Sequence, residues 1–293
     1  MSLVGKIRVL VAALAVAACA TVPGAPWVAT SADGWTPVAA QTRTVGLGLL
    51  PGARLTAGVR FAGGIDIVSP GTPLHGLSDL KIVDGDLISV SDAGDLARAR
   101  LRLDGRGRLT GLDQARIRRL TLTDGSPITD KGDGDAEGLV ITPTGDLLIS
   151  FERDHRIWNY GSLARLDRAP VPVWDCTPAG CRTVVAPPEP LLADSDYRIT
   201  GLDRDPAGDG WFVIERSFRP PGDVRARVRR MAPDGNLGPV LITLQQPGTV
   251  DNFEGIAAVT TPGGVRLYLL SDDNFSDRQR TLLLAFDLAT PRP

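Results

Sequence analysis

Histidine and cysteine are scarce in this chain, which holds two histidines, His75 and His155, and three cysteines among 293 residues. A structural zinc site is built from four Cys or His ligands at close spacing, and the sequence offers no such set. No Gly-x-Ser-x-Gly segment occurs either, so the nucleophile elbow of serine esterases is missing. These absences exclude a zinc-finger module and argue against a serine esterase of that kind.

A strong net charge is also missing. The formal net charge is −2 and the isoelectric point is about 5.8, which gives no electrostatic reason to expect a nucleic-acid partner. Lysine is rare and occurs only as Lys6, Lys81 and Lys131, so almost all positive charge is arginine. The 43% of hydrophobic residues is enough for one large core, which excludes a disordered or fibrous chain.

Helical patterns are nearly absent, because no window sustains apolar residues at i, i+3, i+4 and i+7 with caps. The apolar run 9–18 is too short to span a bilayer as a permanent helix. It follows Lys6 and Arg8 and ends in Val-Ala-Ala-Cys19, which resembles the lipobox of bacterial lipoproteins. We therefore predict that residues 1–18 are a lipoprotein signal peptide and that Cys19 carries lipid. An ordinary secretory signal with a coincidental cysteine is the alternative.

The residues after this signal predict the location of the protein. There is no twin arginine, and Ala20 rather than Asp follows the cysteine, a pattern similar to lipoproteins sorted to the outer membrane. Residues 19–44, rich in Pro, Ala and Thr, are predicted to be the lipidated cysteine with a flexible tether, and residues 45–293 the folded domain. We expect a lipid-anchored monomer that faces the periplasm.

Two cysteines remain once Cys19 is assigned to lipid. Cys176 and Cys181 flank a short turn that contains Pro and Gly, and in an oxidising compartment we expect them to form a disulfide. Because the loop is short, its contribution to stability should lie at the low end of about 2–4 kcal/mol.

A repeated pair of apolar strands fills the rest of the chain. Each copy has a Gly-Leu or Gly-Ile turn, an alternating strand, a second turn, a second apolar strand and a closing acid. The glycines of the four copies are Gly76, Gly138, Gly201 and Gly255, so the unit recurs about every fifty to sixty residues. A third strand with alternating arginines follows, as at 97–103 and 225–231, and is typical of a half-solvated outer strand.

This strand quartet predicts an all-β fold, a β-propeller of four-stranded blades. We expect about five blades, with four or six as alternatives. Strands expected around 44–50, 55–61 and 65–68 would form a fifth blade or complete the last one from the N-terminus. A β-sandwich is the alternative architecture, but it would not explain the repeated glycines.

Three segments carry a resemblance to a known family: 135–139, 252–256 and, most specifically, 267–284. Together they resemble the phytase-like family, which is also described by an esterase-like activity. The resemblance covers roughly residues 74–288. It implies a propeller and an exported location, and it makes hydrolysis of phosphoric or carboxylic esters the expected activity.

Acidic residues occupy corresponding places in the copies. One set follows the second strand, another stands just before the first strand, and Asp135 belongs to the loop 133–137; in chain order the candidates are Asp92, Asp135, Glu137, Glu152, Glu215, Glu254 and Asp272. In a propeller these loops meet at one end of the central channel, and clustered carboxylates repel unless a cation neutralises them. Calcium takes six to eight oxygen ligands, so we predict a calcium site. It is not an EF-hand, because Thr144 stands at the twelfth position counted from Asp133.

Three arginines and one histidine are candidates for catalysis. Arg153 and Arg216 directly follow acids of the set, and Arg280 follows the fourth acidic loop. Such arginines can hold a phosphate beside calcium, or each can simply pair with a neighbouring carboxylate. His75 precedes Gly76, where two other copies have an acid, and is either a proton carrier or a surface residue.

Two functions follow from these patterns. The first is a calcium-dependent hydrolase that acts on a small phosphate ester or carboxylic ester. The second is a non-catalytic binding propeller whose loops hold calcium structurally.

Overall fold

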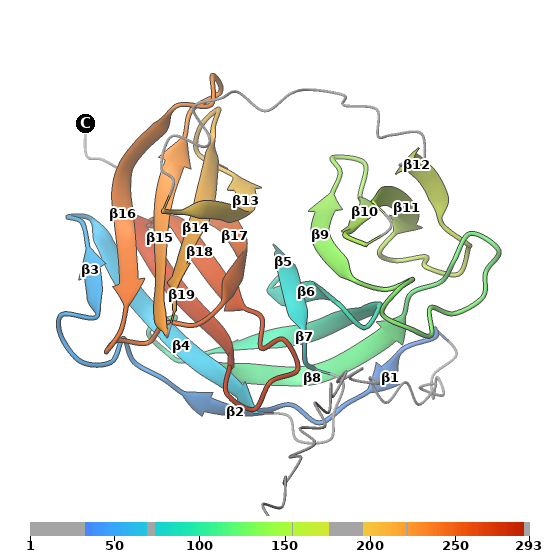
Figure 1. Ribbon diagram of the computed structural model, residues 1–293, viewed down its shortest axis with the longest axis horizontal. Coiled ribbons are helices and arrows are strands. Elements are labelled where there is room, and N and C mark those ends of the chain that lie inside the picture. Colours follow the sequence, from blue (N-terminus) through green and yellow to red (C-terminus); the bar gives the residue numbers. More distant parts are fainter. Residues whose placement is uncertain (1–32, 69–73, 154, 176–195, 221, 290–293) are drawn as a thin grey trace, which may run out of the picture.

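The computed structural model of this chain describes residues 33–68, 74–153, 155–175, 196–220 and 222–289 (Figure 1). These residues form 19 β-strands and no helix, which confirms the all-β prediction. None of the described segments forms a helix of the length and hydropathy needed to cross a membrane. The cysteines predicted to carry lipid and to form a disulfide (Cys19, Cys176 and Cys181) lie outside the described residues.

Most strands belong to four antiparallel quartets that follow one another along the chain. The first quartet is β5 (Leu77–Val83), β6 (Asp86–Ser91), β7 (Asp95–Leu103) and β8 (Leu109–Arg119). The second is β9 (Ala136–Ile141), β10 (Asp146–Phe151), β11 (Arg156–Ser162) and β12 (Val171–Asp175). The third is β13 (Arg198–Arg204), β14 (Trp211–Arg219), β15 (Asp223–Met231) and β16 (Leu237–Gln245). The fourth combines β17 (Phe253–Thr261), β18 (Gly264–Ser271) and β19 (Thr281–Ala289) with β4 (Val59–Val68).

The N-terminal strands extend these quartets. β4 pairs antiparallel with β19, so the N-terminal segment completes the last sheet and does not begin a fifth. A single parallel pair, Gly63 with Leu109, also joins β4 to β8. β1 (Thr36–Pro37) pairs with β8 and β2 (Gln41–Thr44) with β4, so part of the predicted tether belongs to the sheets.

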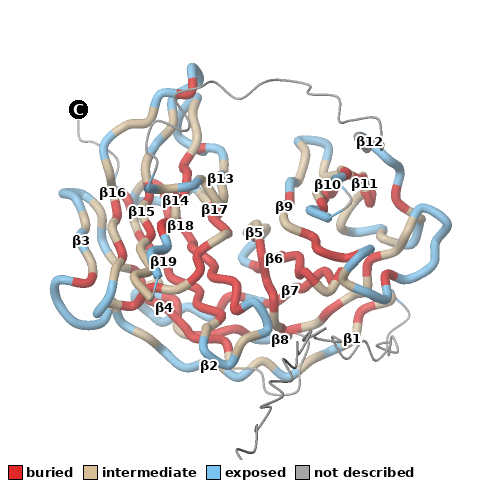
Figure 2. The backbone as a smooth tube through the Cα atoms, viewed as in Figure 1, coloured by how far each residue is buried: buried red, intermediate tan, exposed pale blue. Residues whose placement is uncertain are grey.

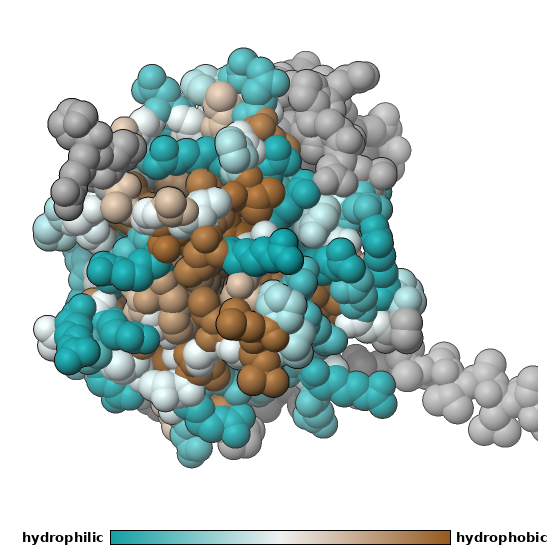
Figure 3. All heavy atoms as spheres, turned by 90° about the vertical axis from the view of Figure 1, so that its left-hand side faces the viewer, coloured by the Kyte–Doolittle hydropathy of each residue, from teal (hydrophilic) through white to brown (hydrophobic). Residues whose placement is uncertain are grey.

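A further short strand, β3 (Ala53–Leu55), covers the outer edge of β16 and protects it from pairing with another chain. Hydrophobic side chains gather on the surface on this side of the molecule (Figure 3). Leu49 and Leu50, in the loop before β3, are 72% and 87% exposed.

The first strand of each quartet lies toward the middle of the molecule, and the later strands lie progressively outward (Figure 1). Side-chain hydrogen bonds connect these first strands to one another. Asp79 of β5 accepts a hydrogen bond from the Leu139 backbone N–H of β9 at 2.9 Å. Asp203 of β13 accepts one from the Ala258 N–H of β17 at 2.8 Å and another from Lys81 Nζ of β5 at 2.9 Å. Each carboxylate therefore satisfies a backbone donor on the neighbouring quartet.

Glycine allows the first strands to approach so closely. A Cβ at Gly201 would lie 2.2 Å from the carbonyl oxygen of Glu254 on β17. A Cβ at Gly255 would lie 3.0 Å from the Ser78 carbonyl oxygen on β5. Gly138, Gly201 and Gly255 thus lie inside β9, β13 and β17, and not in turns as we expected.

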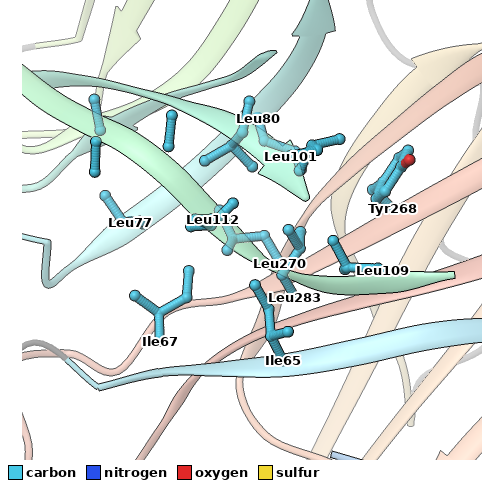
Figure 4. Packing of buried hydrophobic residues seen from close by; sticks show 14 of the residues in the cluster. Ile65, Ile67, Leu77, Leu80, Leu101, Leu109, Leu112, Tyr268, Leu270 and Leu283 are labelled. Atoms are coloured by element: carbon cyan, nitrogen blue, oxygen red, sulfur yellow. The ribbon is translucent and has the colours of Figure 1, made fainter. Parts of the chain in front are cut away.

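The core consists of three clusters, each between two neighbouring quartets (Figure 2). The fourth quartet is covered on both faces. On β18, Tyr268 and Leu270 belong to the cluster shared with the first quartet (Figure 4). Leu267 and Leu269 belong to the cluster shared with the third quartet. Successive strand residues face opposite sides, so a sheet buried on both faces needs the uninterrupted apolar run seen here.

The second and third quartets, by contrast, share no core cluster among the described residues. Leu202 of β13 is 46% exposed, whereas Leu80, Leu139 and Ile256, which follow the same bulge in the other first strands, are at most 1% exposed. The described quartets therefore pack in the order second, first, fourth, third.

Asp203→Ala is expected to lower the free energy of unfolding by about 2–3 kcal/mol, because Lys81 and the Ala258 N–H both lose their partner. Chemical denaturation of the purified protein measures this loss. Asp113→Ala is the matched control, since Asp113 pairs with Arg102 at the surface with both side chains about half exposed, and its effect should stay within about 0.5 kcal/mol. Equal effects of the two substitutions would contradict the role given to Asp203.

Candidate metal and anion site

A β-bulge interrupts the pairing of every first strand at a corresponding point. The register shifts between Leu77 and Leu80 on β5, and at the matching place on β9, β13 and β17. The residues that the ladder skips include Ser78, Glu137, Thr200 and Glu254. Because a bulge turns a side chain away from the regular alternation, it is a way of aiming a residue at a site.

The strand register corrects two of our repeat assignments. Ser78, and not His75, corresponds to Glu137 and Glu254. At the end of the second strand, Arg216, and not Glu215, corresponds to Asp92, Glu152 and Asp272. A shift of one residue turns a strand side chain to the other face. Glu215 is accordingly only 2% exposed and forms a bidentate pair with Arg227 of β15, at 2.8 and 2.9 Å.

The other predicted acids meet in one cavity of about 490 Å³, which we call the acid pocket. Its lining comes from the first, second and fourth quartets and the loops between them, and consists of Asp92, Lys131, Asp135, Glu137, Ser150, Phe151, Glu152, Arg153, Glu254, Asp272 and Asn274. Six of the seven predicted ligands are thus brought together, and Glu215 is not.

Three of these carboxylates lie close enough to share an ion. One oxygen each of Asp92, Asp135 and Glu137 lie within 4.8 Å of one another. The Asp135 backbone N–H donates to the Asp92 carbonyl at 2.7 Å, and its own carbonyl accepts from the Glu152 N–H at 3.0 Å. Asp135 has a φ of +58°, a conformation that costs energy in a residue with a side chain.

Two acids of the pocket carry raised pKa values. Burial, followed by the negative charges of Asp92, Glu254 and other neighbours, raises the pKa of Glu137 to about 8. Burial and the charge of Asp92 also raise the pKa of Asp272 to about 8. Within the described residues, neither carboxylate forms an ion pair. Both carboxyls therefore keep their protons near neutral pH, and ionising them would create negative charge that the described side chains of the pocket do not neutralise.

Three cationic side chains pair with three of the other acids, Asp92, Asp135 and Glu254. Lys131 Nζ lies 2.7 Å from Asp92 and 3.1 Å from Asp135. Arg153 Nε lies 2.6 Å from Asp135, and Arg216 Nη1 lies 2.6 Å from Glu254. Arg153 and Arg216 each pair with a carboxylate in this structure. The sequence analysis did not select Lys131, although its rarity in an arginine-rich chain was a signal.

The donor set fits a hard cation such as calcium. All the acid ligands are oxygens, and no Cys or His lines the pocket among the described residues. Asp135 is 2% exposed, and its Oδ1 accepts no hydrogen bond; its charge partner is Lys131 Nζ at 3.1 Å. A metal ion in the pocket would take the place of the ammonium group at this buried oxygen.

His75 and Arg280 lie in a different cavity of about 390 Å³, together with Asp273 and Thr281. His75 Nδ1 lies 2.6 Å from Asp273 Oδ2, and Thr281 Oγ1 donates to the same oxygen at 2.9 Å. Burial opposes the charge of Asp273, but hydrogen bonds from His75, Gly76 and Thr281 hold its pKa below the ordinary value. The structure thus separates these two candidates from the acid pocket, with the segment Asp272–Asn274 between the two cavities.

Comparison with known proteins gives one family. A family model described as Phytase-like, esterase-like activity of phytase, matches residues 72–183 and 173–275. No curated protein matches the chain significantly. Among solved structures, the computationally designed Ika8 protein aligns with 10% sequence identity over 75% of this chain. The alignment spans 55% of the design and has a TM-score of 0.19, too low to indicate a shared fold.

Glu137→Gln is expected to raise the melting temperature at pH 9 in chelator and to change it little at pH 4. A carboxyl with a raised folded-state pKa contributes stability that is fully present below its unfolded-state pKa of 4.5 and is lost progressively as the pH rises through about 8, and glutamine removes this loss. Calorimetry at both pH values measures the difference. Glu254→Gln is the contrast, because Glu254 is paired with Arg216 and should show no such gain. The same effect of Glu137→Gln at both pH values would contradict the charge assignment.

Proposed function

This chain belongs to the phytase-like family, and we propose from that premise that it is a calcium-dependent hydrolase of phosphoric or carboxylic esters. The observation that carries the proposal is the convergence of six carboxylates, which stand far apart in the sequence, on one pocket. Concentrating like charge is costly unless a cation is bound, so the arrangement is that of a binding site and not of a solvated surface.

Asp92, Asp135 and Glu137 would hold the ion, with Glu152, Glu254 and Asp272 around them. When bound, calcium would supply positive charge that polarises the phosphoryl or carbonyl group of the substrate. Arg153 is 58% exposed and bonds Asp135 through Nε, which leaves the rest of its guanidinium to the pocket. It would orient a phosphate through two parallel N–H donors. Arg216, which pairs with Glu254 but does not line the pocket, would add positive charge near the substrate.

The four strand quartets are, in this proposal, the blades of a propeller. Their first strands lie at the middle of the molecule (Figure 1), and in a propeller their bulges and the ends of the second strands would surround a common axis. The number of blades would then be four, one of the alternatives to the five that we expected, with β4 completing the last blade from the N-terminus.

The protein would act at the cell envelope. The lipobox-like segment that ends at Cys19 and the following Ala20 support an outer-membrane lipoprotein that faces the periplasm, anchored by lipid and otherwise monomeric.

A non-catalytic binding propeller is the second candidate. It is favoured by the absence of histidine from the described lining of the acid pocket, because His75 lies in the other cavity. In that case calcium would stiffen the loops, and the pocket would bind a ligand without converting it.

The hydrolase proposal predicts turnover of p-nitrophenyl phosphate or p-nitrophenyl acetate that calcium supports and a chelator abolishes. The double variant Glu137→Gln, Glu254→Gln should lose at least about a hundredfold in kcat/KM. The cation loses the charge of one ligand, and Arg216 loses its carboxylate partner. Colour release measured with and without chelator tests this.

Asp113→Asn, at the exposed pair with Arg102, is the matched control and should keep full activity. A calcium-dependent rise in melting temperature without turnover across a broad ester panel would favour the binding propeller instead.

The proposed lipid anchor predicts that Cys19→Ser abolishes incorporation of labelled palmitate and releases the protein from the membrane fraction. Fractionation of cells that express either form measures this. Labelled, membrane-bound Cys19→Ser protein would overturn the lipid assignment.

A further inference from the structure

Lys131 occupies the position where a cation would sit in the acid pocket. Its Nζ lies 2.7 Å from Asp92 Oδ2 and 3.1 Å from Asp135 Oδ1, and these two residues are also two of the three carboxylates that lie within 4.8 Å of one another. The ammonium group therefore contacts two of the three residues that the proposed function assigns to calcium.

The backbone around Lys131 is fixed, although its side chain is not buried. Gly134 N–H donates to the Asp130 carbonyl at 2.9 Å, and the Asp133 N–H donates to Asp130 Oδ1 at 2.9 Å. A Cβ at Gly134 would lie 2.7 Å from the Asp92 carbonyl oxygen, so this loop packs directly on the first quartet. The Lys131 side chain, in contrast, is 33% exposed, so it can leave the acids while the loop stays in place.

A divalent ion and the ammonium group cannot both hold these carboxylates. Placing two positive groups within a few ångströms in a partly buried site is strongly unfavourable. Lysine is suited to be displaced, because its compact ammonium sits on a flexible stem and makes no bidentate contact. The Lys131 ammonium also lies 6.0 Å from the centre of the Phe275 ring, which offers it a face to rest against outside the acid cluster.

We propose that Lys131 is an internal occupant of the cation site, which calcium displaces and which then becomes a contact for the anionic substrate. This inference rests on the proposed function and concerns the regulation of the same site. In the absence of calcium the lysine neutralises Asp92 and Asp135. In its presence the released ammonium joins Arg153 on the solvent side of the pocket, so that the substrate phosphate meets positive charge only when the ion is bound.

Calcium titration of the purified protein tests the competition. Lys131→Met removes the charge and keeps the length of the side chain, and it should tighten calcium binding by at least about tenfold. It should also lower the melting temperature in chelator, because two buried acids lose their partner, and lower kcat/KM at saturating calcium. Lys131→Arg is the control, and its calcium affinity should stay near that of the wild type. Tighter binding together with weaker catalysis is a combination that a purely structural lysine would not produce.

Amine labelling gives a second readout. Calcium should raise the rate at which acetic anhydride modifies Lys131, whereas Lys81, paired with Asp203 and only 12% exposed, should serve as an unchanged internal reference. Mass spectrometry of peptides measures both rates.

The outcomes separate the two proposals. Equal calcium affinity of wild type and Lys131→Met, with no change in labelling, would overturn the role of Lys131 and leave the calcium site standing. No calcium binding by any of the three proteins would overturn both. Binding by Lys131→Met alone would show that the lysine and the ion compete, but it would overturn the displacement of the lysine by calcium in the wild type.

Discussion

The close approach of the first strands is the constraint on which the rest of the structure depends. These strands do not form ladder hydrogen bonds with one another, so backbone polar groups that face a neighbouring first strand need other partners. Gly201 and Gly255 remove the side chain where a backbone oxygen passes, and Asp79 and Asp203 accept backbone N–H groups across the gap. Burial raises the pKa of Asp79 to about 6, because desolvation outweighs the charge of Lys81 and the hydrogen bonds from the Leu139 and Leu80 N–H groups. The same convergence brings the strand-end acids together.

The acid pocket therefore depends on where the strands place its acids as well as on the acids themselves. Bulges on the first strands aim Glu137 and Glu254 inward, and the ends of the second strands add Asp92, Glu152 and Asp272. Packing of the three core clusters stabilises an arrangement that electrostatic repulsion alone would open. Concentrated charge of this kind is typical of sites that bind a ligand, because nothing in the packing itself requires it.

Much of the fold and of the acid set could be predicted from the sequence, because period-two alternation and repeated glycines are local signals. What the sequence could not settle was which distant strands pair. The N-terminal strand β4 joins β19, more than two hundred residues away, and no local pattern specifies that contact. The strand register was equally absent from local patterns: Arg216, and not Glu215, occupies the position that corresponds to the strand-end acids, where it pairs with Glu254. Lys131 reaches the acids only because its loop folds over Asp92, which is a tertiary contact.

The packing order of the described quartets also determines how stability is distributed. The first and fourth quartets each contact two neighbours through core clusters, whereas the second and third each contact one. In such an array, the interfaces between neighbours determine the cooperativity of unfolding. The first and fourth quartets should therefore resist local unfolding most, and the second and third quartets should unfold at lower free energy. Because β4 pairs with β19, the sheet that should resist unfolding most combines strands from near the two ends of the described chain.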